Sequence, residues 1–157
     1  MKRLTFRRYS RLLLGFLFLA SGCLDGGTGT GNPGMGSTAG SQNLASFRIL
    51  NGVCAKLNQC VPGTTVENCR FRVSSVTNLE APLGITTGTY ANYLAILLAE
   101  NADTLRADPA ATGSCLVEIS NLACSNPDVQ TAVGADGNFN GVARMLENGA
   151  SSCAGVF

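Results

Sequence analysis

The chain has 157 residues, of which 45% are hydrophobic and 13% charged, and its formal net charge is +1. Five of the eleven basic residues fall within the first eleven positions and the other six are scattered, so the sequence lacks the basic stripe that tracks nucleic-acid phosphates. It also has no histidine, the usual general base for a serine or cysteine nucleophile, so we expect neither a nucleic-acid partner nor an enzyme.

Residues 1–22 have the layout of an export signal. A basic segment ending at Arg11 precedes an apolar run from Leu12 to Ala20, which is far shorter than the ~20 residues that span a bilayer. The pair Arg7-Arg8 also suggests a twin-arginine signal, although the apolar residue that this signal favours beyond the pair is missing.

Ala20-Ser21-Gly22-Cys23 resembles the lipobox of bacterial lipoproteins, with Ala20 where Leu is usual. The resemblance implies cleavage before Cys23, a diacylglyceryl group on its thiol and acylation of the new amino terminus, which together would anchor the protein to a membrane. Leu24 follows where inner-membrane lipoproteins tend to carry Asp, which implies the outer membrane. The alternative is an ordinary signal peptide cleaved near Ala20, which leaves Cys23 as a thiol.

The segment that follows Cys23 is rich in Gly, Thr, Ser and Asn and almost free of apolar side chains. Such a segment buries too little surface to offset the entropy of ordering, so we expect residues 23–42 to be the lipidated cysteine and a flexible linker. Without residues 1–22 the chain carries six basic and ten acidic residues, a net charge of −4.

Residues 43–157 are expected to form one all-α domain, a small helical bundle stapled by disulfides. Apolar residues recur every three or four positions from Leu44 to Leu57, which predicts a helix that Pro62-Gly63 ends. A second helix is expected from Val66 to Val76 behind Thr64 or Thr65 as its cap. A half-buried strand over residues 70–73 is the alternative.

The rest of the domain carries weaker helical patterns. A loop rich in Thr and Gly is expected over residues 84–89. An apolar stripe from Tyr90 to Leu98 predicts a third helix, and Asp108-Pro109 predicts the start of a fourth, whose apolar stripe runs from Cys115 to Leu122. Asn126-Pro127-Asp128 is expected to end one helix and is a candidate start for another. A short last helix is expected from Val142 to Gly149.

An even set of six cysteines follows Cys23: Cys54, Cys60, Cys69, Cys115, Cys124 and Cys153. In an exported chain such a set predicts disulfides, and zinc is disfavoured because the sequence offers neither histidine nor cysteine pairs separated by two residues. Two antiparallel helices joined by a short turn would place Cys54 level with Cys69, which predicts that bridge. A Cys54–Cys60 bridge is disfavoured by their separation along one helix, and the other pairings stay open.

One stretch has the spacing of a calcium-binding loop. Asp136, Asn138, Asn140 and Glu147 occupy positions 1, 3, 5 and 12 of the EF-hand pattern, with Gly141 at position 6 for the sharp turn. Arg144 stands where an oxygen ligand or water is expected, and the alternative is a polar turn whose asparagines cap the last helix. Calcium is therefore the one cofactor that the sequence suggests.

A broader resemblance covers about two thirds of the domain. The residues that carry it are the segment from Cys54 to Cys60, Cys69, Cys115-Leu116 with Cys124, and the closing segment 152–157. In these residues the chain is similar to cysteine-rich envelope lipoproteins of predatory and gliding Gram-negative bacteria. The resemblance implies an outer-membrane lipoprotein without an established activity, on the periplasmic side or at the surface. An envelope protein is a further expected partner.

The acidic residues show no pairing that would suggest an acid and a base. We expect them on solvated helix surfaces; they are Glu67, Glu80, Glu100, Asp103, Asp108 and Glu118. The function that the sequence favours is a non-enzymatic binding or structural module anchored in the envelope, and the alternative is a calcium-binding lipoprotein.

Overall fold

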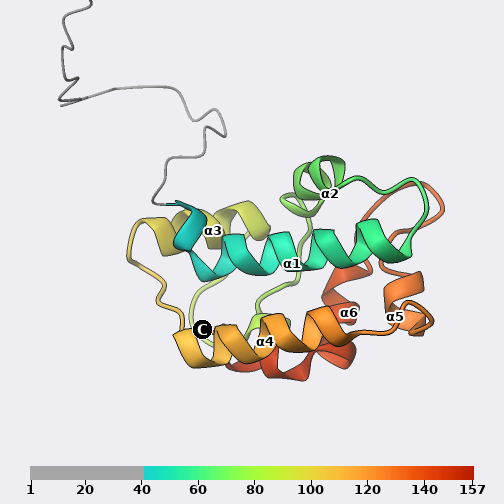
Figure 1. Cartoon of the computed structure of the whole chain (residues 1–157). Coiled ribbons are helices and arrows are strands. Elements are labelled where there is room, and N and C mark those ends of the chain that lie inside the picture. The colour runs from blue at the N-terminus through green and yellow to red at the C-terminus, as the bar shows by residue number, and fades with distance from the viewer. Residues whose placement is uncertain (1–40) are drawn as a thin grey trace, which may run out of the picture. The chain divides into compact units, whose positions relative to one another are not determined.

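The computed structural model describes residues 41–157, and every regular element in this range is a helix (Figure 1). The six α-helices are α1 (Ala45–Cys60), α2 (Val66–Val73), α3 (Tyr93–Asn101), α4 (Pro109–Asn121), α5 (Pro127–Gln130) and α6 (Val142–Gly149). Three short 3-10 turns complete them: η1 (Ser41–Asn43), η2 (Ala81–Leu83) and η3 (Ser151–Gly155). The prediction of an all-α domain is confirmed. The export signal, Cys23 and the linker up to residue 40 lie outside the described residues.

Helix boundaries follow the capping residues of the sequence. The hydroxyl of Thr65 accepts a hydrogen bond from the backbone N–H of Asn68 at 3.2 Å and begins α2. Asp108 Oδ1 accepts from the N–H groups of Ala110 and Ala111 at 2.7 and 2.9 Å, with Pro109 as the first residue of α4. The predicted caps at Thr65 and Asp108 are therefore confirmed.

Some predicted boundaries are wrong. Residues 70–73 belong to α2, so the strand alternative fails, and α2 ends at Val73 instead of reaching Val76. The third helix begins at Tyr93, because Asn92 Oδ1 accepts from the N–H of Ala95 at 3.0 Å and stops the helix from extending back to Tyr90.

The core surrounds α1, which contacts α2, α3, α4 and α5. In Figure 1, α1 and α4 run side by side in the same direction, and α6 packs behind α4. Each supplies one apolar stripe, as the spacing of three and four residues predicts. The largest fully buried side chains are Tyr93, Ile49, Leu57, Leu79, Leu83, Ile96, Ile119, Met145 and Leu146.

The last residues of the chain join two distant parts of this core. The backbone N–H of Asp108 donates to the carbonyl O of Val156 at 2.7 Å, and the N–H of Phe157 donates to the carbonyl O of Leu83 at 3.1 Å. Val156 is fully buried. The segment after η3 therefore connects the start of α4 to η2, and it belongs to the folded core.

Candidate functional site

All six cysteines of the domain are paired. Cys54 bonds Cys69 with an S–S distance of 2.00 Å, Cys60 bonds Cys124 at 1.98 Å, and Cys115 bonds Cys153 at 2.06 Å. The predicted Cys54–Cys69 bridge is confirmed. The other two bridges span 64 and 38 residues, and they depend on how α1, α4 and η3 pack, which the local pattern does not specify.

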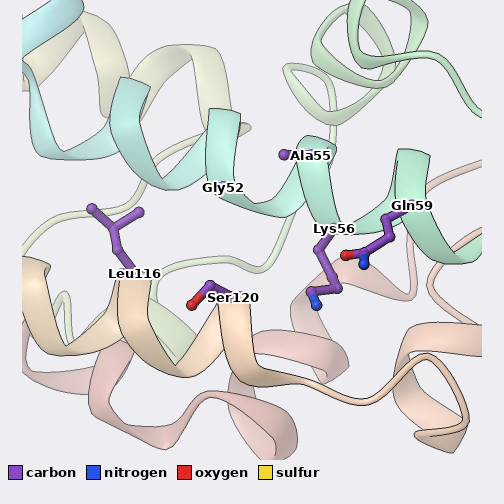
Figure 2. A pocket seen from close by; sticks show the side chains of 6 residues that line it. All are labelled: Gly52, Ala55, Lys56, Gln59, Leu116 and Ser120. Atoms are coloured by element: carbon purple, nitrogen blue, oxygen red, sulfur yellow. The ribbon is translucent and has the colours of Figure 1, made fainter.

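A shallow groove of about 180 Å³ lies between α1 and α4 (Figure 2). Gly52, Ala55, Lys56 and Gln59 of α1 line one wall, and Leu116 and Ser120 of α4 line the other. A Cβ added to Gly52 would lie 3.1 Å from Cδ2 of Leu116, so the glycine allows the two helices to approach closely.

Lys56 is the charged residue of this groove, and only 7% of it is exposed. Figure 2 shows its side chain extending from α1 towards the end of α4. Its Nζ donates to the carbonyl O of Leu122 at 3.0 Å, just beyond the last residue of α4. A cation is favourable there because the free carbonyl groups of a helix C-terminus carry partial negative charge.

The sequence does not predict this role of Lys56. In the sequence the residue is one of six scattered basic side chains, whereas in the structure its aliphatic stem is buried and its ammonium is fixed against α4. Nothing local reveals this arrangement, because α4 begins about fifty residues later. The Lys56 ammonium is committed to the Leu122 carbonyl, which leaves the Gln59 amide and the Ser120 hydroxyl as the polar side-chain groups on the walls of the groove.

Several acidic residues expected on solvated surfaces are instead tied to distant backbone amides. Glu80 Oε1 accepts from the N–H of Tyr90 at 3.0 Å, and Glu118 Oε2 accepts from the N–H of Ser152 at 2.9 Å. The hydrogen bonds from Ser152 lower the pKa of Glu118. These carboxylates hold loops against helices, which corrects the expectation of free surface charge.

Glu100 is the clearest case. Its carboxylate accepts hydrogen bonds from the backbone N–H groups of Ala45 and Ser46 at 2.7 and 2.9 Å, and from the Ser46 hydroxyl at 2.5 Å. Leu44, the residue before α1, has an apolar side chain and makes no capping hydrogen bond to the helix. An acid more than fifty residues away therefore satisfies the first free amides of α1 and faces the positive end of its dipole.

Three of the four residues predicted to bind calcium lie in one hydrogen-bonded polar turn. Asp136 Oδ1 accepts hydrogen bonds from the backbone N–H of Asn138, at 3.3 Å, and from its side-chain amide, while Asn138 Oδ1 accepts from the N–H of Asn140 at 3.1 Å. The hydrogen bonds from Asn138 lower the pKa of Asp136. The side-chain oxygens of Asp136 and Asn138 therefore already accept hydrogen bonds within this turn, and Asn140 takes part through its backbone N–H.

The backbone of this loop differs from the EF-hand expectation. Gly137 has φ +74°, whereas Gly141, the expected turn residue, has φ −70°. A Cβ at Gly141 would overlap the carbonyl O of Thr131, so this glycine allows two segments to touch. Glu147 is exposed in α6. The turn predicted at Gly141 is made at Gly137 instead.

The described part of the chain contains no cluster of three or more His, Cys, Asp or Glu side chains placed to hold a metal ion. Within residues 41–157 no helix combines the length and the apolar character needed to cross a bilayer. No protein-family model, no curated protein and no solved structure matches the chain.

Proposed function

We propose that the chain is a lipoprotein of the bacterial outer membrane, in which acylated Cys23 anchors a helical domain that acts as a non-enzymatic binding or structural module. One observation supports this most directly. Of the seven cysteines in the sequence, six bond one another in the three bridges of the domain. Cys23 is left over, and an odd cysteine in an exported chain calls for a separate role.

The bridges also support an exported protein. Disulfides form and persist in oxidising compartments such as the periplasm and the cell surface, and they are rare in the cytosol. The basic and apolar segments of residues 1–22, followed by Ala20-Ser21-Gly22-Cys23, supply the export and acylation signals for that route. Lipid at Cys23 and disulfides beyond residue 43 are therefore two consequences of the same export.

Acylation is tested by expressing the full chain in a Gram-negative host fed an alkyne-tagged palmitate. We expect label on the wild-type protein, sedimentation with the outer membrane, and a mature N-terminus at Cys23 bearing acyl groups by mass spectrometry. Cys23→Ser should abolish label and membrane association, while Ser37→Ala, a matched change in the same linker, should keep both. An unmodified N-terminus on the wild-type protein would overturn the proposal.

The calcium-binding version remains a separate proposal, supported by the gathering of Asp136, Asn138 and Asn140 in one loop. Calorimetric titration of the wild-type protein with millimolar calcium should then release heat and raise the melting temperature. Asp136→Asn and Glu147→Gln should abolish both effects, and Glu67→Gln on α2 should leave them unchanged. A wild-type protein without heat or thermal shift would remove calcium from consideration.

A further inference from the structure

The three disulfides differ sharply in their exposure to solvent. Cys54, Cys69, Cys115 and Cys153 each have 0% exposure, so two bridges are sealed inside the core. Cys60 is only partly buried, and Cys124 is exposed. Since a thiolate must reach a sulfur atom to break a disulfide, Cys60–Cys124 is the most accessible of the three bridges in the folded domain.

The Cys60–Cys124 bridge joins two segments that hydrogen bonds also hold in place. Cys60 is the last residue of α1, and Cys124 lies in the non-helical segment between α4 and α5. Other contacts hold the same segment: Lys56 Nζ bonds the carbonyl O of Leu122 at 3.0 Å, and the amide of Gln130 bonds the carbonyl O of Cys124. The segment therefore keeps its place in the fold by hydrogen bonds that do not involve the sulfur atoms.

From these observations we infer that the Cys60–Cys124 disulfide is a thiol-exchange site for a protein dithiol of the envelope, while the two core bridges are structural. The inference rests on the proposed export to the envelope, but it does not depend on lipid at Cys23 or on calcium. It extends the proposed function by assigning a reactive site and a class of partner to the folded domain.

The exchange proceeds in two balanced steps. A thiolate of the partner attacks Sγ of Cys124, so that the Cys60–Cys124 bond breaks, a mixed disulfide forms at Cys124, and Cys60 leaves as a thiolate that takes a proton from solvent. The partner's second thiolate then attacks the partner sulfur of the mixed disulfide and releases Cys124, which is protonated in turn. The domain gains two electrons and two protons, and the partner dithiol is oxidised to a disulfide.

Reduction by this route would leave the core intact. Both core bridges, the buried apolar side chains and the Lys56 contact remain, so the reduced domain should keep its helices. The change is local: the end of α1 is no longer covalently joined to the segment after α4, at the end of the groove that contains Lys56 and Gln59. The domain would thus have two covalent states with the same fold.

The first test measures which bridge is reduced in the native full chain. The protein is treated with millimolar glutathione or dithiothreitol at neutral pH, quenched with acid at intervals, alkylated and mapped by mass spectrometry. We expect alkylation of Cys60 and Cys124 at least about tenfold faster than that of the four core cysteines, with an unchanged helical circular dichroism spectrum. Equal rates for all three bridges, or earlier reduction of a core bridge, would overturn the inference.

The second test traps the mixed disulfide between the domain and a partner dithiol protein. An envelope dithiol oxidoreductase whose resolving cysteine is replaced by serine is mixed with the native protein, and a covalent complex linked through Cys124 is expected. The double variant Cys60→Ser/Cys124→Ser should form no complex, whereas the matched double variant Cys54→Ser/Cys69→Ser should still form it. If the second variant does not fold, peptide mapping of the wild-type complex decides: linkage through Cys124 supports the proposal, and linkage through any other cysteine, or no complex, contradicts it.

Discussion

Glu100 holds Ser46 by two hydrogen bonds, from the backbone N–H at 2.9 Å and from the hydroxyl at 2.5 Å, and so joins the last turn of α3 to the first turn of α1. The phenol of Tyr93, at the start of α3, donates to the carbonyl O of the same serine at 2.6 Å. Two residues of one helix thus satisfy the buried polar groups at the beginning of another, which fixes how the two helices meet.

Replacing Glu100 by Gln should destabilise the domain by about 2 kcal/mol. The amide keeps the size of the side chain but removes the negative charge that the N–H groups of Ala45 and Ser46 bind. Urea unfolding followed by circular dichroism measures the change. The control is Glu147→Gln on the exposed face of α6, which should alter stability by less than about 0.5 kcal/mol. Equal effects of the two substitutions would contradict the capping role of Glu100.

Tyr93 should make the domain sensitive to alkaline pH. Burial, and then the charge of Glu100, raise the pKa of Tyr93 far above its usual value near 10.0. The folded state therefore keeps the proton while the unfolded state releases it above about pH 10, so stability is full below that pH and is lost as pH rises. The expected slope is about 1.4 kcal/mol per pH unit.

Unfolding of the wild-type protein and of Tyr93→Phe should be compared between about pH 8 and pH 11. At neutral pH the variant should lose about 1 kcal/mol with the hydrogen bond to Ser46. Its stability should then fall less steeply than that of the wild type as pH rises. Parallel pH profiles for the two proteins would refute the prediction.

The Glu118 carboxylate should stabilise the domain at neutral pH but not in acid, where it is protonated. The hydrogen bonds from Ser152 lower the pKa of Glu118 from 4.5, so the stabilising effect is present above about pH 4.5 and is lost as pH falls through the lower pKa of the folded state. Glu118→Gln should therefore reduce stability at neutral pH and have little effect in acid. The difference in urea midpoint between the variant and the wild type, followed from neutral to acid pH, is the measurement.

Two glycines should respond in opposite ways to alanine. Gly84 has φ +79°, and a Cβ there would overlap the carbonyl O of Ala154, so Gly84→Ala should destabilise the domain by more than about 1 kcal/mol. Gly113 lies within α4, where a Cβ would meet nothing within 4 Å, so Gly113→Ala should stabilise by about 0.5–1 kcal/mol. Melting temperatures of the two variants should move in opposite directions, and a shared direction would count against the close contact between η2 and η3.

What the sequence could predict was local. Thr65 and Asp108 identified helix starts because a capping side chain binds amides two or three residues away. Cys54 and Cys69 could be paired because a short turn joins their helices. These interactions span few residues, so spacing alone is informative about them.

The roles that could not be predicted depend on packing between distant segments. Glu100 meets Ser46 across 54 residues, and Lys56 meets Leu122 across 66. In the sequence both side chains look like ordinary surface charges, since no local signal states which helix they will face. In the candidate calcium loop, by contrast, the spacing of the residues gave a clear local signal that predicted the wrong turn residue. The turn forms at Gly137, and Gly141 instead allows close contact with the backbone of Thr131.

None of the three bridges joins cysteines that are neighbours in the order of the sequence. Cys60 lies between Cys54 and Cys69, Cys69 and Cys115 lie between Cys60 and Cys124, and Cys124 lies between Cys115 and Cys153. A chain oxidised progressively as it emerges from a translocon would thus first acquire incorrect pairs, and native protein would accumulate only after these are reshuffled. Under the proposed export, we therefore expect native protein to accumulate faster when a disulfide isomerase is present.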